Sequence, residues 1–386
     1  MSAQTAGPLA GVRVIEFGQY IAVPGAAQIL ADQGATVIKL EPPSGEPSRA
    51  LPGYGLAMFQ AYNRGKRMVT IDLKTAAGRA AAEALVLDAD VVLSNLRPGA
   101  MQAYGLGARE LRAARPELIC VELTGFGDSD GTVRRPGLDI AAQAESGIMW
   151  VTGPAGDEPQ RVGFPVVDAA SAAVIAQAVT AALVGRGRTG EGAEIRVSLL
   201  DVAISLQAPN WMEYALTGVP PRRKGNGQPG AAPAADVIAV ADGYVVISAY
   251  TPAHWKVLCE LIGRPDLVAD PRFATSPARV ANRAAMHEVL SGTLSGRTKA
   301  ECVDMLVGAG LVAGSIKTYP EVLADRQAQP HGIFVAAPPA TGEGQPDWFV
   351  GPPARWDGLR PAIERPRDAG ADNHILRDHP QPTPAR

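Results

Sequence analysis

The 386-residue sequence contains few cysteine and histidine residues, and neither type is grouped. Its three cysteines, Cys120, Cys259 and Cys302, are widely separated and odd in number. This argues against a disulfide framework or a zinc site and favours a reducing compartment. The five histidines all lie at residue 254 or beyond, without the spacing of metal ligands. We therefore expect a cytoplasmic protein with no metal site.

Charge of one sign is not in excess either. The formal net charge is -3, so nothing draws the whole molecule to nucleic acid or to anionic membranes. The first eight residues lack a basic region followed by an apolar stretch, so no signal peptide is predicted. The long uncharged run at 169–185 is short for a membrane span and rich in alanine, which favours a buried core helix.

Short apolar runs alternate with helical stretches through the first half of the chain. The runs predict strands at 11–17, 37–40, 68–73, 91–93, 118–123 and 193–199. Helices are expected at 24–32, 76–87, 169–185 and 200–216. This order predicts an α/β fold with a mostly parallel, Rossmann-like sheet. Ligands of such sheets bind at the carboxyl ends of the strands.

The composition changes at Pro220, where a segment rich in glycine, proline and alanine begins. Beyond it, Asp242-Gly243 is typical of a hairpin turn between two strands, and helices are expected near 253–262, 279–291 and 299–309. We predict a smaller α+β domain at 226–325, with linkers at 220–226 and 325–328. The remaining parts, 1–220 and 328–386, are assigned to a discontinuous large α/β domain.

Two familiar motifs are absent or out of context. The turn after the first strand, from Gly18 to Gly25, lacks Gly-x-Gly-x-x-Gly and would crowd a pyrophosphate. A nicotinamide-dependent dehydrogenase is therefore only a weak alternative, although Glu41 fits a ribose contact. The sequence from Gly127 to Gly131 matches Gly-x-Ser-x-Gly, but a loop follows it where a nucleophile elbow needs a helix. A serine hydrolase is accordingly disfavoured.

A single carboxylate, Asp168, precedes the uncharged run at 169–185. One interpretation is helix capping, in which the side chain accepts hydrogen bonds from the N–H groups of the first turn. The other is nucleophilic catalysis, in which a partly dehydrated carboxylate attacks an activated acyl group. Taken alone, the segment favours capping.

Basic residues gather around the third and fourth predicted strands: Arg64, Lys66, Arg67, Lys74 and Arg97. Ordinary solvated surface charge explains each of them singly. Because they cluster at adjacent strand ends, a phosphate-bearing ligand is the alternative.

Several ordered segments together resemble the family III CoA-transferases. They are Asn63-Arg64-Gly65-Lys66-Arg67, Ile71-Asp72-Leu73-Lys74, Asn95-Leu96-Arg97-Pro98-Gly99, Asp139 with Gln143-Ala144-Glu145-Ser146-Gly147, and Asp168. The similarity extends from Pro8 to about Arg377. The family includes the formyl-CoA and carnitine CoA-transferases. The same fold houses α-methylacyl-CoA racemase. The resemblance implies an interlocked homodimer, acyl-CoA and a small carboxylic acid as substrates, and no tightly bound cofactor.

The resemblance also implies that Asp168 is the nucleophile, forming mixed anhydrides and an aspartyl-CoA thioester. Asp139 then either orients active-site groups or is a buried structural carboxylate. A glycine-rich loop covers the site in similar enzymes. Its counterparts here are Gly225, Gly227, Gln228 and Gly230, for which a plain linker is the equal alternative.

The resemblance implies that several residues contact CoA. They are Ile21, Ala22, Pro42, Ile71, Asp72, Leu73, Lys74, Asn95, Leu96, Arg97 and Tyr104. Pro42 replaces an arginine of some relatives, so the 3′-phosphate contact passes to Lys74, Arg97 or Arg49.

Racemisation is the main rival function. It needs two bases, and racemases carry a histidine immediately before the counterpart of Asp139, where this chain has Leu138. A CoA-transferase is therefore preferred. A CoA-binding protein without catalysis is a further alternative. The sequence does not identify the acids, although Tyr20, Trp150 and Trp211 are candidates for the acyl pocket.

Overall fold

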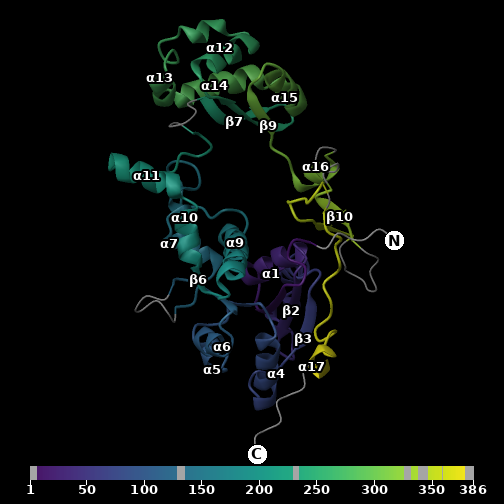
Figure 1. Ribbon diagram of the computed structural model, residues 1–386. Coiled ribbons are helices and arrows are strands. Elements are labelled where there is room, and N and C mark those ends of the chain that lie inside the picture. The colour runs from purple at the N-terminus through teal and green to yellow at the C-terminus, as the bar shows by residue number, and fades with distance from the viewer. Residues whose placement is uncertain are drawn as a thin grey trace, which may run out of the picture. The chain divides into compact units, whose positions relative to one another are not determined.

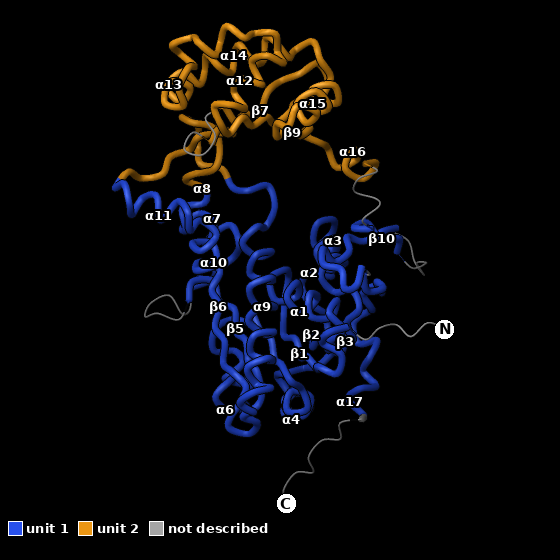
Figure 2. Tube along the Cα trace, turned by 45° about the horizontal axis from the view of Figure 1, so that its top comes forward, with its two compact units in different colours: residues 1–148, 161–218, 327–386 blue, residues 149–160, 219–326 orange. Residues whose placement is uncertain are grey.

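The computed structural model describes residues 7–127, 135–228, 234–325, 332–337, 347–358 and 360–378, and the chain forms two compact units (Figures 1 and 2). Unit 1 comprises residues 1–148, 161–218 and 327–386, and unit 2 comprises 149–160 and 219–326. Residues 149–160 thus group with the smaller unit, whereas the sequence predicts them in the large domain.

Unit 1 is built on a six-stranded parallel sheet in the order β3-β2-β1-β4-β5-β6. The strands are β1 (Arg13–Phe17), β2 (Thr36–Glu41), β3 (Arg67–Thr70), β4 (Val91–Ser94), β5 (Ile119–Thr124) and β6 (Glu194–Ser198). The predicted α/β class is confirmed. The strand order reverses between β1 and β4, and the carboxyl ends beside that point are the expected ligand site. β3 is shorter than predicted, so residues 71–74 lie in the loop at this edge.

Helices cover both faces of the sheet because neighbouring strand residues point to opposite sides. Val14 belongs to the core under α1 (Ala22–Asp32) and α9 (Val166–Thr189), and Ile15 belongs to the core under α4 (Ala76–Leu87) and α6 (Ala108–Ala114). Both side chains are fully buried. This explains why the strands are apolar runs rather than alternating patterns.

The long apolar helix α9 packs along one side against α1, with Val167, Ile175 and Val179 buried. By length and composition alone it could cross a membrane, and 33% of its most apolar window is buried. Its inner side is thus part of the core of unit 1, and its outer side is the more exposed one.

Two predicted helices are each interrupted. The stretch 200–216 forms α10 (Leu199–Ser205) and α11 (Ala208–Thr217), because Pro209 is accommodated only in the first turn of a new helix. The stretch 279–291 likewise divides into α13 (Ser276–Ala281) and α14 (Arg283–Leu294).

Unit 2 has an antiparallel sheet in the order β7-β8-β9. Its strands are β7 (Ala234–Val240), β8 (Gly243–Ala249) and β9 (Val312–Ser315). Helices α12 (Pro252–Leu261), α14 and α15 (Lys299–Gly308) pack with the sheet around a core that includes Trp255 and Phe273.

The shorter elements complete the chain. They are α2 (Pro47–Ala50), α3 (Tyr54–Tyr62), α5 (Ala100–Ala103), α7 (Asp139–Glu145), α8 (Ile148–Val151), a 3₁₀ helix (Pro265–Val268), α16 (Tyr319–Ala324), β10 (Phe334–Ala336), β11 (Trp348–Val350) and α17 (Ile375–Asp378). Near the C-terminus, Asp372 and Asn373 accept hydrogen bonds from the Met68 and Thr70 N–H groups at 2.9 Å. These side chains cap the open edge of the sheet at β3.

Candidate active site

A pocket of about 150 Å³ lies at the carboxyl ends of β1 to β4. It is lined by Phe17, Gly18, Gln19, Leu40, Glu41, Pro42, Glu46, Ile71, Asp72, Leu73, Lys74, Leu96 and Tyr104. Segments that are distant in sequence therefore converge at the switch point of the sheet. Pro42, the segment Ile71 to Lys74, Leu96 and Tyr104 are the predicted CoA contacts that the structure brings together here.

Other predicted CoA positions lie beside the pocket rather than on its wall. Ile21 and Ala22 are buried at the start of α1. Asn95 binds the backbone of Gln19, accepting from its N–H at 2.9 Å and donating to its carbonyl at 3.0 Å. Arg97 is exposed on the loop after β4. Asn95 thus holds the β1–α1 turn.

Two residues of the expected basic cluster, Arg64 and Lys66, are buried rather than on the surface. Lys66 is fully buried on Glu16, and the guanidinium of Arg64 pairs with Asp32 at 2.5 Å. Neither of the two interpretations predicted from sequence applies to these side chains, because a charge inside a core must be paired internally. Lys74 lines the pocket, and Arg97 is solvent-exposed.

Arg49, the third candidate for a phosphate contact, is also engaged. Its Nε and Nη2 atoms bind the two oxygens of Glu41 at 2.8 and 2.9 Å, and its guanidinium stacks 3.8 Å from the centre of the Phe59 ring. This two-point ion pair uses the donors that a phosphate would need.

Asp168 is not a helix cap. Helix α9 has Pro165 at its N-cap, and Asp168 is the third helical residue. Among the described residues, no hydrogen bond or ion pair is made by the Asp168 carboxylate. The capping role belongs to Asp139, whose Oδ1 accepts from the Val167 and Asp168 N–H groups at 2.7 and 3.2 Å. Asp139 therefore leaves the Asp168 side chain available.

The Asp139 carboxylate is buried and fully engaged. Its Oδ2 accepts from Gln143 Nε2 at 2.5 Å, while Gln143 Oε1 accepts from the Val162 N–H at 2.9 Å. Both residues lie on α7, so this network connects α7, the segment before α9 and the first turn of α9. Sequence alone left open whether this carboxylate orients other groups or is a structural one, and the contacts observed here are with Gln143 and with the backbone of α9.

Asp168 is electrostatically unusual. Burial and then the nearby Asp139 charge raise its pKa from 3.8 to about 7. Such a carboxylate is more basic than an ordinary aspartate and less well solvated, which suits nucleophilic attack when it is ionised.

The surroundings of Asp168 include residues that sequence reasoning missed. Burial, Tyr54 and the Asp168 charge raise the pKa of Tyr62, which places its phenol in the electrostatic range of that carboxylate. Gly25 of α1 faces Ala172, one turn beyond Asp168. A Cβ at position 25 would lie 2.9 Å from the Ala172 Cβ and 3.4 Å from Tyr62 Cδ1. Glycine therefore allows α1 and α9 to approach closely, a requirement that helix periodicity does not reveal.

The predicted glycine loop has demanding local geometry within unit 2. Gly225 has a φ of 60° and its N–H donates to the Gly153 carbonyl at 3.1 Å. A Cβ at Gly227 would lie 2.6 Å from Arg283 Nε, so the guanidinium packs directly on the loop backbone. Gln228 is exposed, and Gly230 lies outside the described residues.

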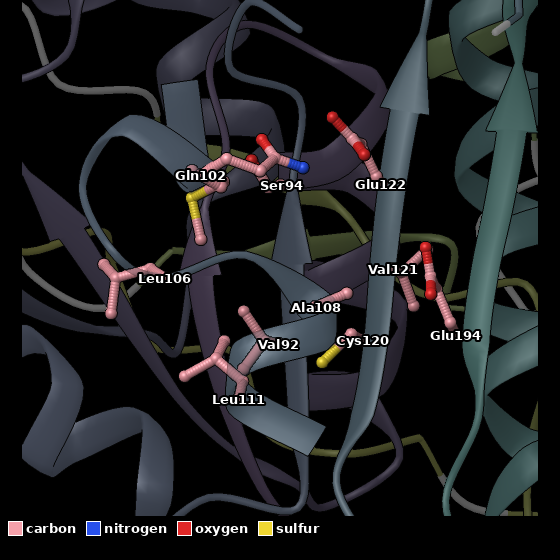
Figure 3. Close-up of a pocket in the computed structure, with 11 residues that line it drawn as sticks. Val92, Ser94, Gln102, Leu106, Ala108, Leu111, Cys120, Val121, Glu122 and Glu194 are labelled. Atoms are coloured by element: carbon pink, nitrogen blue, oxygen red, sulfur yellow. The ribbon is translucent and has the colours of Figure 1, made fainter. Parts of the chain in front are cut away.

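A second pocket lies between β4, β5 and the segment carrying α5 and α6 (Figure 3). Its volume of about 30 Å³ leaves room for only a few water molecules. Val92, Leu111 and Cys120 line it, and burial raises the pKa of the Cys120 thiol to about 12. The thiol stays protonated at neutral pH, so we place no reaction there.

Comparisons with known proteins agree with this geometry. The family model described as CoA-transferase family III matches residues 9–373. A Mycobacterium tuberculosis protein named Probable fatty acyl-CoA transferase is 42% identical over 333 residues, covering 82% of this chain and 84% of the relative. The Succinate–glutarate CoA-transferase of Agrobacterium fabrum is 36% identical over 339 residues, covering 85% and 84%.

The solved structures include a protein of the same overall fold. A CaiB/BaiF family protein from Brucella suis has a TM-score of 0.85 at 33% identity, covering 97% of this chain and 99% of its own. The similarity seen in the sequence motifs is confirmed, and it replaces the alternatives of a dehydrogenase and a serine hydrolase. The chain belongs to CoA-transferase family III.

Proposed function

We propose that this enzyme transfers CoA between carboxylic acids, with Asp168 as the nucleophile. The observation that carries the proposal is the Asp168 carboxylate at the start of α9. It has no partner among the described residues, its pKa is raised to about 7, and a second carboxylate performs the capping. An available carboxylate with raised basicity is what attack on a thioester requires.

The proposed sequence conserves the energy of the thioester. An ionised Asp168 oxygen attacks the acyl carbonyl and the C–S bond breaks. CoA leaves as a thiolate, and the acyl group remains on Asp168 as a mixed anhydride. The thiolate then attacks the aspartyl carbonyl, which releases the donor acid and leaves an aspartyl-CoA thioester. The acceptor carboxylate attacks this thioester and forms a second anhydride, from which the returning thiolate takes the new acyl group. Asp168 is regenerated.

Within this proposal the pocket at the carboxyl ends of β1 to β4 holds CoA. Lys74 and the exposed Arg97 supply cations for its phosphates, and Tyr104 contacts the adenine. CoA is a substrate and no resident cofactor is needed. The loop containing Gly225 and Gly227 would exclude water from the activated intermediates, since anhydrides hydrolyse readily.

We also propose that the enzyme is an interlocked cytoplasmic homodimer. Large apolar side chains are exposed four residues apart on α11, Met212 (59%) and Leu216 (87%). Neighbouring exposed apolar residues of this kind favour a protein interface. The described cysteines are free and buried, which is compatible with a reducing compartment.

The acids are tested with a matrix of acyl-CoA donors and free acids, from short dicarboxylates to fatty acids, because both classes occur in the names of the relatives. We expect transfer between at least one pair, measured as the new acyl-CoA by mass spectrometry.

The same reactions in D₂O distinguish CoA transfer from racemisation. Leu138, beside Asp139, carries no titratable group, so we expect no deuterium at the α-carbon. Deuterium incorporation without CoA transfer would overturn the proposal in favour of racemisation.

Asp139→Asn tests the positioning role of Asp139. The new amide would place an N–H₂ group against Gln143 Nε2, which cannot turn because Gln143 Oε1 accepts from Val162. We expect a loss of about 1–3 kcal/mol in the free energy of unfolding and a loss of roughly tenfold or more in kcat.

The double variant Asp139→Asn/Gln143→Glu is the matched control. It exchanges donor and acceptor within the pair, so the hydrogen bonds can form again with the same net charge. We expect it to recover most of the stability, as followed by chemical denaturation. Equal destabilisation of the single and double variants would contradict the network described here.

A further inference from the structure

A buried ionic cluster lies directly behind the proposed CoA pocket. Glu16 of β1 binds two ammonium groups, Lys39 Nζ at 2.7 Å and Lys66 Nζ at 2.6 Å, and Lys39 also pairs with Glu46 at 2.7 Å. The side chains of Glu16, Lys39 and Lys66 have no exposed surface, and that of Glu46 has 1%. Removing four charges from water is costly and does not by itself favour folding. Their remaining hydrogen bonds indicate what they do.

Both lysines donate to the backbone of the turn between β1 and α1. Lys39 Nζ donates to the Gly18 carbonyl at 2.7 Å, at the beginning of the turn. Lys66 Nζ donates to the Pro24 carbonyl at 2.8 Å, where the chain has entered α1, and to Asn63 Oδ1 at 3.0 Å. One buried carboxylate, Glu16, thus places the cations that secure the two ends of this turn.

The middle of the turn is held in an unfavourable conformation. Tyr20 has a φ of 64°, a left-handed value that side-chain-bearing residues rarely adopt. On one side of it, Asn95 fixes both the N–H and the carbonyl of Gln19. Such a conformation persists only where its surroundings determine it. Gly18 and Gln19 line the pocket directly, so the shape of this turn is part of the shape of the pocket.

We propose that Glu16, Lys39 and Lys66 are positioning residues for acyl-CoA binding, which act by holding the Gly18–Pro24 turn in its bound shape before CoA arrives. The inference rests on the proposed CoA site. Glu16 and Lys66 do not line the pocket, so any effect of these two residues on CoA affinity is indirect and passes through the turn or through Glu46, the pocket residue that pairs with Lys39. A preformed turn lowers the ordering cost of binding.

The test is the charge-balanced double variant Glu16→Gln/Lys66→Met, which leaves the Lys39–Glu46 pair in place. We expect the Kd for CoA, measured by calorimetry, and the KM for acyl-CoA to rise by about tenfold or more. We expect kcat at saturation to change by less than about threefold, since the loss is in binding and not in the reacting groups. The matched control is Asp32→Asn/Arg64→Gln, which removes a neighbouring ion pair with no bond to the turn. Its Kd should equal that of the wild type.

Lys74→Ala separates failure of this inference from failure of the proposed site. If the wild type binds CoA and Lys74→Ala weakens binding, the site is supported. An unchanged Kd in folded Glu16→Gln/Lys66→Met then overturns the positioning role alone. No CoA binding by the wild type would overturn both the proposed function and this inference.

Hydrogen exchange of the wild type keeps the inference testable even if the double variant does not fold. The peptide spanning residues 17–25 should exchange slowly without CoA and change little when CoA is added, whereas residues 71–74 should become protected. Fast exchange of the turn that slows only with CoA would show that the turn is not held in advance, and would overturn the inference.

Discussion

Asp168→Asn is expected to lower CoA transfer by roughly a thousandfold or more, because it removes the proposed nucleophile while keeping the size of the side chain. Wild-type enzyme mixed with acyl-CoA alone should show a covalent CoA adduct on the peptide containing Asp168. Intact-protein and peptide mass spectrometry should find no such adduct in the variant. Asn cannot form an anhydride that thiolate would convert into a thioester, so both signals should disappear together.

Asp201→Asn is the matched control. Asp201 also lies in the first turn of a helix, α10, where its N–H is capped by Ser198 at 3.0 Å. It is exposed and has no part in the proposed reaction, so its transfer rate should match the wild type. Turnover by Asp168→Asn at the wild-type rate would remove Asp168 from the mechanism, whatever the family membership.

The same Asp168→Asn substitution is expected to stabilise the protein increasingly as pH rises from about 4 to about 7. The pKa of Asp168 is raised from 3.8 to about 7, so the folded protein disfavours the ionised form. As pH rises from 3.8 towards 7, Asp168 loses its proton in the unfolded chain but keeps it in the folded protein. The free energy of unfolding of the wild type therefore falls over this range. Asparagine has no such cost. At about 1.4 kcal/mol for each tenfold difference in proton affinity, the gain at pH 8 is at most about 4 kcal/mol.

The measurement is the free energy of unfolding of both proteins from pH 4 to pH 8, by chemical denaturation. The advantage of the variant should be near zero at pH 4 and grow until about pH 7. Asp201→Asn, at an exposed position, should show no comparable gain. A constant advantage across this pH range would mean that it comes from packing and not from ionisation. A stabilised but inactive variant would indicate that the site holds its nucleophile at a cost in stability.

Much of the fold is readable from the sequence because local signals act over short distances. Apolar runs flanked by turn residues located all the strands of the parallel sheet, and Ala76–Leu87 was predicted with the bounds that the structure has. The errors occur where tertiary contacts override local pattern. Pro209 begins a new helix within the largely uncharged stretch 200–216, which was predicted as one helix. Residues 149–160 group with the second unit through contacts such as Gly153 with Gly225.

The charged residues are the ones whose roles the sequence predicts least well. In the sequence Lys66 and Arg64 are two of several basic residues, indistinguishable from Lys74. Burial decides between them: Lys66 is enclosed on Glu16, whereas Lys74 lines the pocket. Likewise, Asp139 and Asp168 are two isolated acids, 29 residues apart. Only packing shows that Asp139 caps α9, whereas the Asp168 carboxylate on that helix is left without a partner among the described residues.

The sequence by itself determined the α/β order of strands and helices, the segments at the carboxyl ends of the strands, and the family. These follow from local periodicity and from motifs whose order is retained along the chain. The tertiary structure alone decided which charges face the pocket and which are enclosed, that Asp139 and not Asp168 caps α9, and that a strained turn at Tyr20 is held by buried lysines. The physical reason is the same in each case. The energy of a charged side chain depends on its solvation and on partners distant in sequence, and neither exists until the chain is folded.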